Sequence, residues 1–213
     1  EERELTVMLL VDLSASQAFG THEQFKRELA AEICATLAFS AIGNNDKVGL
    51  ICFTDRVEKF IPPRKGGRHV LRLIRELLAL EPAGTGTDLS VPLEYLNKIQ
   101  RRSSVAFLVS DFQGGGYAHP LQMARRKHDL ILIDIGDRRE RDLPKAGLLT
   151  LRDSETGDIV TIDTSSETVR RWYRASTERQ REARERWRRR HCIDCLEIQT
   201  GDDIADALRT FFK

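Results

Sequence analysis

The chain has 213 residues, of which 40% are hydrophobic and 31% are charged, and its formal net charge is +1. This length suits one domain with a sizeable core, and a near-neutral balance gives no overall field that would attract nucleic acid or anionic lipid. No apolar run approaches the roughly 20 residues of a membrane-spanning helix. We therefore expect a single domain over 1–213, with no membrane segment and no nucleic-acid partner.

The cysteines and the start of the chain bear on its compartment. Cys34 and Cys52 fall in helical and strand patterns and are expected to be buried, whereas Cys192 and Cys195 form a lone CxxC. A zinc site needs two further ligands at matching spacing, so we interpret this pair as structural packing. No disulfide framework or signal peptide is visible, which favours the cytoplasm. Because the sequence begins EERELTVMLL, without an initiator Met, we expect a piece of a longer protein, whose membrane tethering stays open.

Strand and helix patterns alternate along the first two thirds of the chain. Segments with helical periodicity lie between short runs of Val, Ile, Leu and Phe. Such runs are typical of parallel strands covered on both faces. The expected strands are 5–11, 48–53, 105–109 and 130–135, and the expected helices are 22–42, 67–80, about 90–101 and 119–127. This alternation predicts an α/β fold, Rossmann-like and doubly wound, with a mostly parallel central sheet flanked by helices.

The pattern changes after Asp134. Two alternating segments around 155–158 predict a hairpin insertion near 147–162. A long Arg-rich helix over 166–190, a strand over 192–199 and a closing helix over 202–212 follow. The long helix has a thin apolar stripe, and its arginines alternate with glutamates at i+3 and i+4. We interpret it as a solvated, self-paired surface, with a weak phosphate or acidic-partner patch at RWRRRH as the alternative.

Three polar clusters lie where strands end or helices begin. They are DLSAS after the first strand, GTGTDLS at 84–90, and VSDF before a triple glycine. In an open α/β sheet the carboxyl ends of the strands form the ligand edge, so we expect these clusters to converge. They supply hard oxygen donors, which suit Mg²⁺, with Mn²⁺ or Ca²⁺ as alternatives. The candidate metal ligands are Asp12, Ser14, Ser16, Thr87 and Asp111. Taken singly, the hydroxyls are also typical helix caps, and Asp111 is typical of a turn.

At these positions the sequence resembles von Willebrand factor A (vWA) domains. DLSAS matches their D-x-S-x-S motif, and Thr87 and Asp111 match the distal threonine and aspartate. The segments DKVGLICFTDRVEKFIPPRKGGRHVLRLI, SSVAFLVSDF, RRKHDLILIDI and RERDLPKAGLLTLRDSETGD are similar to the bacterial family called domain of unknown function 58. The sequence departs from these patterns at IGDRRERDLP and SASQAF, and neither departure removes a ligand.

The resemblance implies a metal-ion-dependent adhesion site (MIDAS) with one free coordination position. A partner protein would fill that position with an Asp or Glu side chain, and the family resemblance makes a MoxR-type AAA+ ATPase a candidate partner. We therefore expect a metal-dependent protein-binding module and not an enzyme. The alternatives are a metal-assisted phosphohydrolase and a structural domain whose site stays empty.

The histidines and the triple glycine are weaker signals. His22, His69 and His128 are expected at the surface or in capping positions, and only His119 follows Asp111 closely enough to approach an ion. The loop Gly114–Gly116 is interpreted either as a mobile loop that shapes partner access or as a simple long turn.

Overall fold

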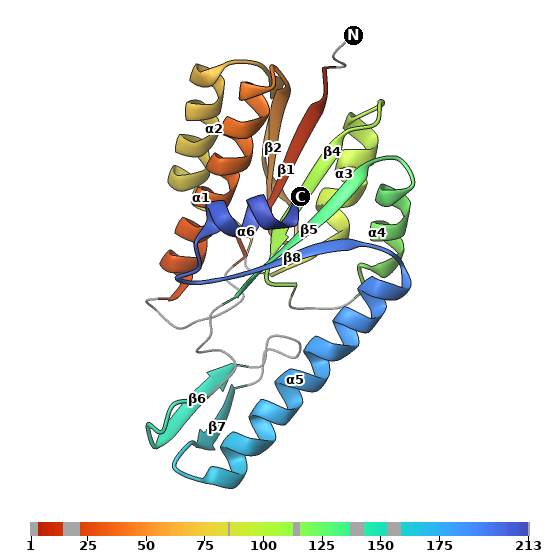
Figure 1. Cartoon of the computed structure of the whole chain (residues 1–213). Coiled ribbons are helices and arrows are strands. Elements are labelled where there is room, and N and C mark those ends of the chain that lie inside the picture. Colours follow the sequence, from red (N-terminus) through yellow and green to blue (C-terminus); the bar gives the residue numbers. More distant parts are fainter. Residues whose placement is uncertain are drawn as a thin grey trace.

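A computed structural model describes residues 4–14, 22–84, 86–112, 116–136, 143–152 and 159–212, with the backbone alone for 22–25 and 151–152. A six-stranded sheet with strand order β3-β2-β1-β4-β5-β8 forms its centre (Figure 1). The strands are β1 (Thr6–Asp12), β2 (Lys47–Phe53), β3 (Val57–Arg64), β4 (Val105–Ser110), β5 (Asp129–Gly136) and β8 (Asp194–Gln199). All neighbours are parallel except β3, which is antiparallel to β2. The predicted doubly wound, mostly parallel α/β sheet flanked by helices is confirmed, and the fold is Rossmann-like.

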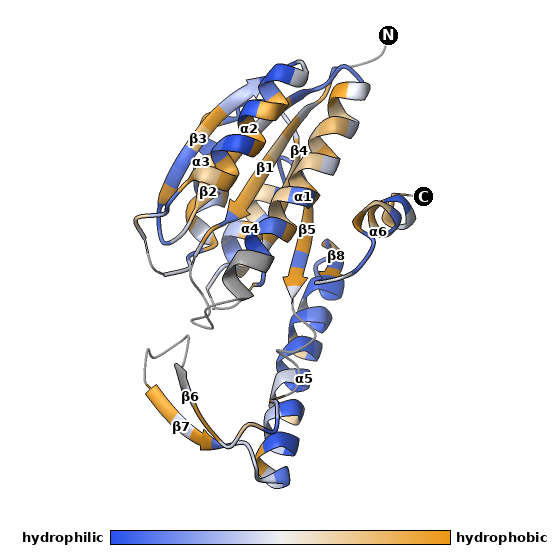
Figure 2. Cartoon of the chain, turned by 90° about the vertical axis from the view of Figure 1, so that its left-hand side faces the viewer, coloured by the Kyte–Doolittle hydropathy of each residue, from blue (hydrophilic) through white to orange (hydrophobic). Residues whose placement is uncertain are grey.

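Helices cover both faces of this sheet. On one face lie α1 (His22–Gly43), α2 (Gly67–Ala79) and α6 (Ile204–Phe211), and on the other lie α3 (Ser90–Ile99) and α4 (Ala118–Arg125). Successive residues of β1 alternate between the two resulting cores: Leu9 packs with α1 and α2, and Leu10 packs with α3 and α4. The central strands β1, β2, β4 and β5 are therefore mostly apolar (Figure 2). Cys34 and Cys52 are buried free thiols, as expected.

Strand β3 was not predicted from the sequence. It contains Pro62 and Pro63 and is mostly half-exposed, so it lacks the continuous apolar run that marks the central strands. Because proline has no N–H to donate to a ladder, such a sequence fits only the edge of a sheet. The pairing of β2 with β3 has irregular register at two places, in keeping with that position.

The predicted hairpin insertion is present, although its turn at 155–158 lies outside the described residues. Strands β6 (Leu148–Arg152) and β7 (Ile159–Asp163) pair antiparallel as a separate two-stranded sheet. The long helix α5 (Glu167–Arg190) follows, and together they extend beyond the carboxyl ends of the central strands (Figures 1 and 2). Among the described helices, none is both long and apolar enough to cross a membrane.

The interpretation of the α5 arginines as a solvated, self-paired surface is wrong for part of its C-terminal half. The exposed surface does carry self-paired charges, such as Arg186 with Glu182 at 3.1 Å. However, Gln180 and Ala183, which belong to the expected apolar stripe, are exposed. A row of arginines faces the sheet instead: Arg181, Arg184 and Arg188, the last only 6% exposed.

Candidate metal centre

Asp12 is the last residue of β1, at the carboxyl edge of the sheet. Its Oδ1 accepts hydrogen bonds from the backbone N–H of Ser14, at 2.9 Å, and from the Ser14 hydroxyl. Its Oδ2 accepts a hydrogen bond from the Ser110 hydroxyl at 2.6 Å. The parallel register pairs Val11 with Val109, which brings Asp12 opposite Ser110 at the end of β4. The two central strands therefore end in the same polar cluster.

Thr87 joins this cluster from the loop before α3. Its hydroxyl donates to the Ser14 hydroxyl oxygen at 2.6 Å, across 73 residues of sequence. The loop itself is held by the β2–β3 connection. The Asp88 N–H donates to the Thr54 carbonyl at 3.2 Å, and Glu58 accepts from the Gly84 N–H at 2.8 Å.

Close packing around Gly84 explains why the first residue of the GTGTDLS segment is a glycine. A Cβ added at Gly84 would collide with the side chains of Thr54 and Asp55. Only a residue without a side chain lets the loop approach the β2–β3 connection this closely. The missed strand β3 therefore helps to position Thr87.

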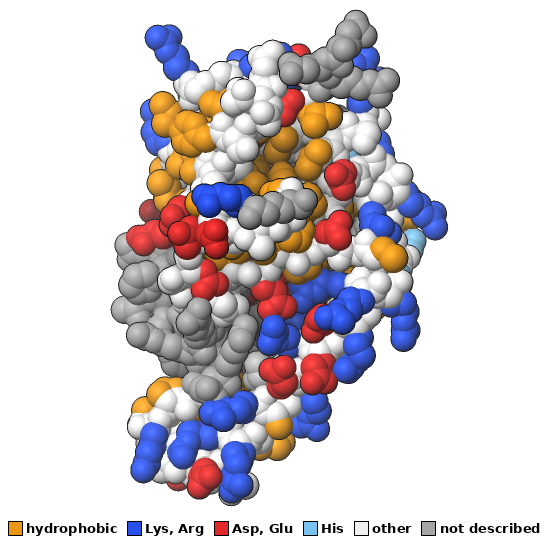
Figure 3. All heavy atoms as spheres, in the orientation of Figure 1, with side chains coloured by type: hydrophobic (Ala, Val, Ile, Leu, Met, Phe, Trp, Pro, Cys, Tyr) orange, Lys and Arg blue, Asp and Glu red, His pale blue; other side chains and the backbone are white. Residues whose placement is uncertain are grey.

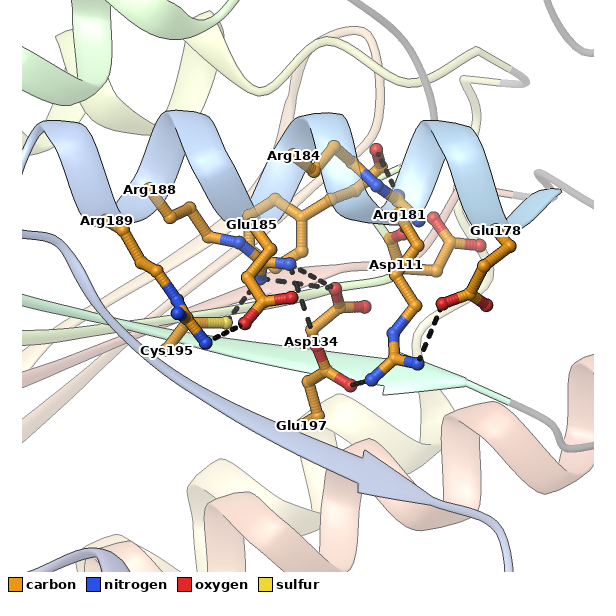
Figure 4. Close-up of polar contacts among 11 residues, drawn as sticks. Asp111, Asp134, Glu178, Arg181, Arg184, Glu185, Arg188, Arg189, Cys195 and Glu197 are labelled. Carbon is orange, nitrogen blue, oxygen red and sulfur yellow. Dashed lines mark hydrogen bonds and ion pairs between the residues drawn. The ribbon is translucent and has the colours of Figure 1, made fainter. Parts of the chain in front are cut away.

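Asp111 follows β4 directly and is 8% exposed. Its Oδ2 lies 3.2 Å from the Nζ of Lys26 on α1, so a buried ammonium faces the carboxylate. The Arg184 side chain donates to the backbone carbonyls of Asp111 and Phe112, at 3.2 and 3.1 Å. Phe112 has a left-handed backbone with φ of 51°, and its N–H donates to the Ser110 hydroxyl at 3.0 Å. Helix α5 thus holds the turn that carries Asp111 (Figure 4).

The environment of Asp12 opposes negative charge. Burial raises the pKa of Asp12 to about 6, and the charge of Asp111 acts in the same direction. Hydrogen bonds from Ser110 and Ser14 partly oppose the shift. Two carboxylates held close in a partly dehydrated site repel each other, and a cation between them would relieve that repulsion.

The donor chemistry fits a hard divalent ion. Asp12, Ser14, Thr87 and Asp111 offer carboxylate and hydroxyl oxygens, which suit Mg²⁺ better than zinc or copper. Ser16, the fifth predicted ligand, lies outside the described residues. Within the described part of the chain, no group of three or more His, Cys, Asp or Glu side chains is placed to hold a metal. A metal at this edge would therefore depend on the hydroxyl donors.

Two contributors to this cluster were missed from the sequence. Ser110 is buried, and its hydroxyl donates a hydrogen bond to Asp12. A hydroxyl at the end of an otherwise apolar strand, next to Asp111, is the signal that would have found it. Lys26 gave no comparable signal, because its role depends on how α1 is rotated against the sheet.

The histidine and glycine predictions have separate outcomes. His128 is buried, not surface or capping as expected, and its Nδ1 lies 2.9 Å from the Ser104 hydroxyl. His69 is half-buried with its Nε2 2.9 Å from the Val48 carbonyl, and His119 is exposed at the start of α4. The side chain of His22 lies outside the described residues, as do Gly114 and Gly115, so the loop prediction stays untested.

The comparisons with known proteins agree with the architecture. The profile of the family described as "Protein of unknown function DUF58" matches residues 1–183. An uncharacterized protein of Mycobacterium tuberculosis (strain H37Rv) is 33% identical over 161 residues, which cover 74% of this chain and 51% of that protein. The chain thus spans about half the length of the curated relatives it matches.

Two solved structures share the fold over nearly the whole chain. One is an aerotolerance-related membrane protein from Bacteroides fragilis, with a TM-score of 0.58 at 15% identity, covering 98% of this chain and 96% of that one. The other is the conserved hypothetical protein BatB from Bacteroides thetaiotaomicron, with a TM-score of 0.57 at 14% identity and the same coverage. At these identities the likeness concerns the fold alone.

Proposed function

The chain belongs to the DUF58 family, with a vWA-like fold, and from that premise we propose that it is a divalent-metal-dependent protein-binding module. Asp12, Ser14, Ser16, Thr87 and Asp111 would hold the ion, with Mg²⁺ preferred over Mn²⁺ or Ca²⁺. The bound ion would supply an electrophilic position for an Asp or Glu carboxylate of a partner protein. Neutral hydroxyl ligands would leave much of the positive charge available to that carboxylate.

One observation carries this proposal: residues far apart in sequence share a single hydrogen-bonded cluster. Thr87 reaches Ser14 at 2.6 Å, and Ser110 reaches Asp12 at 2.6 Å across 98 residues. The described side chains that contact Asp12 or Asp111 offer hydroxyl and ammonium groups, without imidazole or thiol. This chemistry favours binding over acid–base or nucleophilic catalysis.

Titration calorimetry with Mg²⁺ and Mn²⁺ tests the metal. We expect millimolar or tighter binding, lost in Asp111→Asn and weakened at least tenfold in Thr87→Val. Asp88→Asn is the matched control, since Asp88 lies in the same loop region but is exposed, and among the described residues its carboxylate accepts hydrogen bonds only from Ser90. Binding that is absent in the wild type, or equally lost in the control, would contradict the proposal.

Partner capture tests the second half of the proposal. The candidate suggested by the family resemblance is a MoxR-type AAA+ ATPase from the same organism. We expect it to bind immobilised protein in Mg²⁺, to elute with EDTA, and to be lost in Asp111→Asn. Capture that is equal with and without EDTA would show that the metal does not mediate this contact.

A further inference from the structure

A shallow groove of about 490 Å³ runs between α1 and α2, on the outer surface of one helical layer. Its lining is almost wholly apolar, with Ala35 and Phe39 from α1 and Leu71, Ile74 and Leu78 from α2. Three of these side chains are strongly exposed for their size: Leu71 at 61%, Leu78 at 49% and Phe39 at 46%. Exposed apolar side chains that gather in one groove are typical of a binding surface.

The α2 side of the groove is basic, whereas exposed Glu32 lies on the α1 side, one turn before Ala35. Arg68, Arg72 and Arg75 of α2 are exposed, and none of them forms an ion pair with any described residue. The exposed arginines of α5 differ, since Arg171, Arg186 and others pair with glutamates one turn away. In Figure 3 apolar side chains gather over α1 and α2, with basic side chains at their outer border and acidic side chains below them.

We propose that this groove binds an acidic amphipathic helix of a partner protein. Leu71 and Leu78 are seven residues apart, so they present two apolar contacts about 10 Å apart along α2. Helix α2 is 13 residues long, or about 20 Å, which matches a partner helix of three to four turns. Such a helix would insert apolar residues at i, i+3 or i+4, and i+7, a recurring mode of recognition.

Charge and shape both select this occupant. Asp and Glu residues flanking the apolar stripe would pair with Arg68, Arg72 and Arg75, which form no ion pair within the described part of the chain. A concave groove accepts a ridge of side chains, as in helix–helix packing, whereas a membrane surface offers no ridge. The groove lies along the helices and not at the carboxyl edge of the sheet, so this contact should not need the metal (Figure 1).

Fluorescence anisotropy with three labelled 18-residue peptides tests the proposal. The first has a leucine stripe flanked by Glu, the second the same stripe flanked by Lys, and the third the composition of the first in scrambled order. We expect the first to bind at least tenfold more tightly than the other two, with no change in EDTA or in Asp111→Asn. Leu71→Ser with Leu78→Ser, or Arg72→Glu alone, should weaken binding at least tenfold.

Matched controls come from exposed residues elsewhere. Leu148→Ser changes a leucine that is 73% exposed on β6, and Arg102→Glu makes the same charge change away from the groove. Neither should alter binding, and circular dichroism should show all variants folded. Equal binding of all peptides, or binding unaffected by Leu71→Ser with Leu78→Ser, would overturn the proposal.

Two further measurements distinguish a partner helix from a membrane surface or a second copy of the chain as the occupant of the groove. If the leucine variants instead abolish sedimentation with phosphatidylglycerol vesicles, the surface binds membrane and the proposal is wrong. If they instead convert a dimer to a monomer in analytical ultracentrifugation, the groove joins two copies of the chain, which also overturns it. Retained peptide binding in the absence of any metal binding would support this inference while refuting the proposed metal function.

Discussion

Lys26 is the residue whose charge bears most directly on the proposed metal centre. Its ammonium lies 3.2 Å from Asp111, and both side chains are largely buried, at 13% and 7% exposure. A buried ion pair of this kind offsets the negative charge that would otherwise attract a metal. An incoming divalent ion must therefore compete with Lys26 for the same carboxylate.

Replacing Lys26 with Met should tighten Mg²⁺ binding. The substitution keeps an apolar stem on α1 and removes the competing charge, so we expect the dissociation constant to fall roughly threefold to tenfold. Calorimetric titration checks this, with Lys98→Met on the exposed surface of α3 as the control. Unchanged or weaker binding in Lys26→Met would show that the ammonium supports the site instead of competing for it.

For individual residues, part of the polar cluster at the carboxyl edge of the sheet could be predicted from the sequence. Asp12, Ser14, Thr87 and Asp111 could be placed at one edge because parallel strands end there together, whatever the details of packing. The bond between Ser110 and Asp12 could not, because it depends on which strands are neighbours and on their register. The contact of Lys26 with Asp111 depends on how α1 is rotated about its axis, and sequence periodicity fixes that rotation only coarsely.

Among the elements, α5 is attached to the body of the molecule by buried charge. The Arg188 guanidinium lies 3.3 Å from Asp134 on β5, contacts the Cys195 thiol and lies 3.9 Å from Glu197 on β8 (Figure 4). Arg181 reaches Glu197 at 2.7 Å. Burial raises the pKa of Asp134 to about 6, although Arg184 and Arg188 oppose that shift. The carboxylate of Asp134 therefore depends on its arginines to remain charged.

Arg188→Met should destabilise the protein by about 3 kcal/mol, because it leaves Asp134 buried without its partner. The double variant Arg188→Met with Asp134→Leu should recover much of that loss, since an apolar pair needs no compensation. Urea unfolding measures both free energies. Arg186→Met is the control and should cost less than about 0.5 kcal/mol, as its pair with Glu182 is exposed. A double variant no more stable than the single one would refute this account.

This arginine row could not be predicted from composition. Arginines and glutamates that alternate along a helix usually form a solvated surface, and most of α5 does so. What differs is the sheet beneath it, where Asp134 and Glu197 lie on adjacent strands paired in register. Neither carboxylate is near α5 in sequence, so only the assembled sheet shows that the helix has a charged inner side.

For the whole molecule, acid stability should depend on His128. Burial lowers the pKa of its imidazole to about 4, against an ordinary 6.5. Between these values the unfolded chain binds a proton that the folded chain does not, so stability falls as the pH drops from 6.5 towards 4. Asp134 acts in the opposite sense, because its raised pKa lets the folded state hold a proton that the unfolded state releases.

His128→Asn isolates the histidine contribution. The asparagine keeps a polar partner for Ser104 but does not titrate. Between pH 7 and pH 5 the variant should lose about 2 kcal/mol less stability than the wild type, as measured by urea unfolding at each pH. His119→Asn, an exposed histidine, is the control and should follow the wild type. Parallel pH profiles for the wild type and His128→Asn would contradict the assignment.

The architecture as a whole was largely readable from the sequence. Apolar runs of strand length between helical repeats correctly predicted four strands of the main sheet, because strands covered on both faces are largely apolar. The alternating pattern near the C-terminus correctly predicted a fifth strand, β8. Strand β3 was missed because it is less completely buried and its sequence has no continuous apolar run.

The prolines of β3 also affect whether separate molecules can associate through this edge of the sheet. An exposed border strand is a template on which a second chain can add, and chains that add repeatedly form fibrils. Because Pro62 and Pro63 are consecutive and have no N–H, the open edge of β3 lacks a donor that such growth would use. Edge-to-edge polymerisation through β3 should therefore be disfavoured even at high protein concentration.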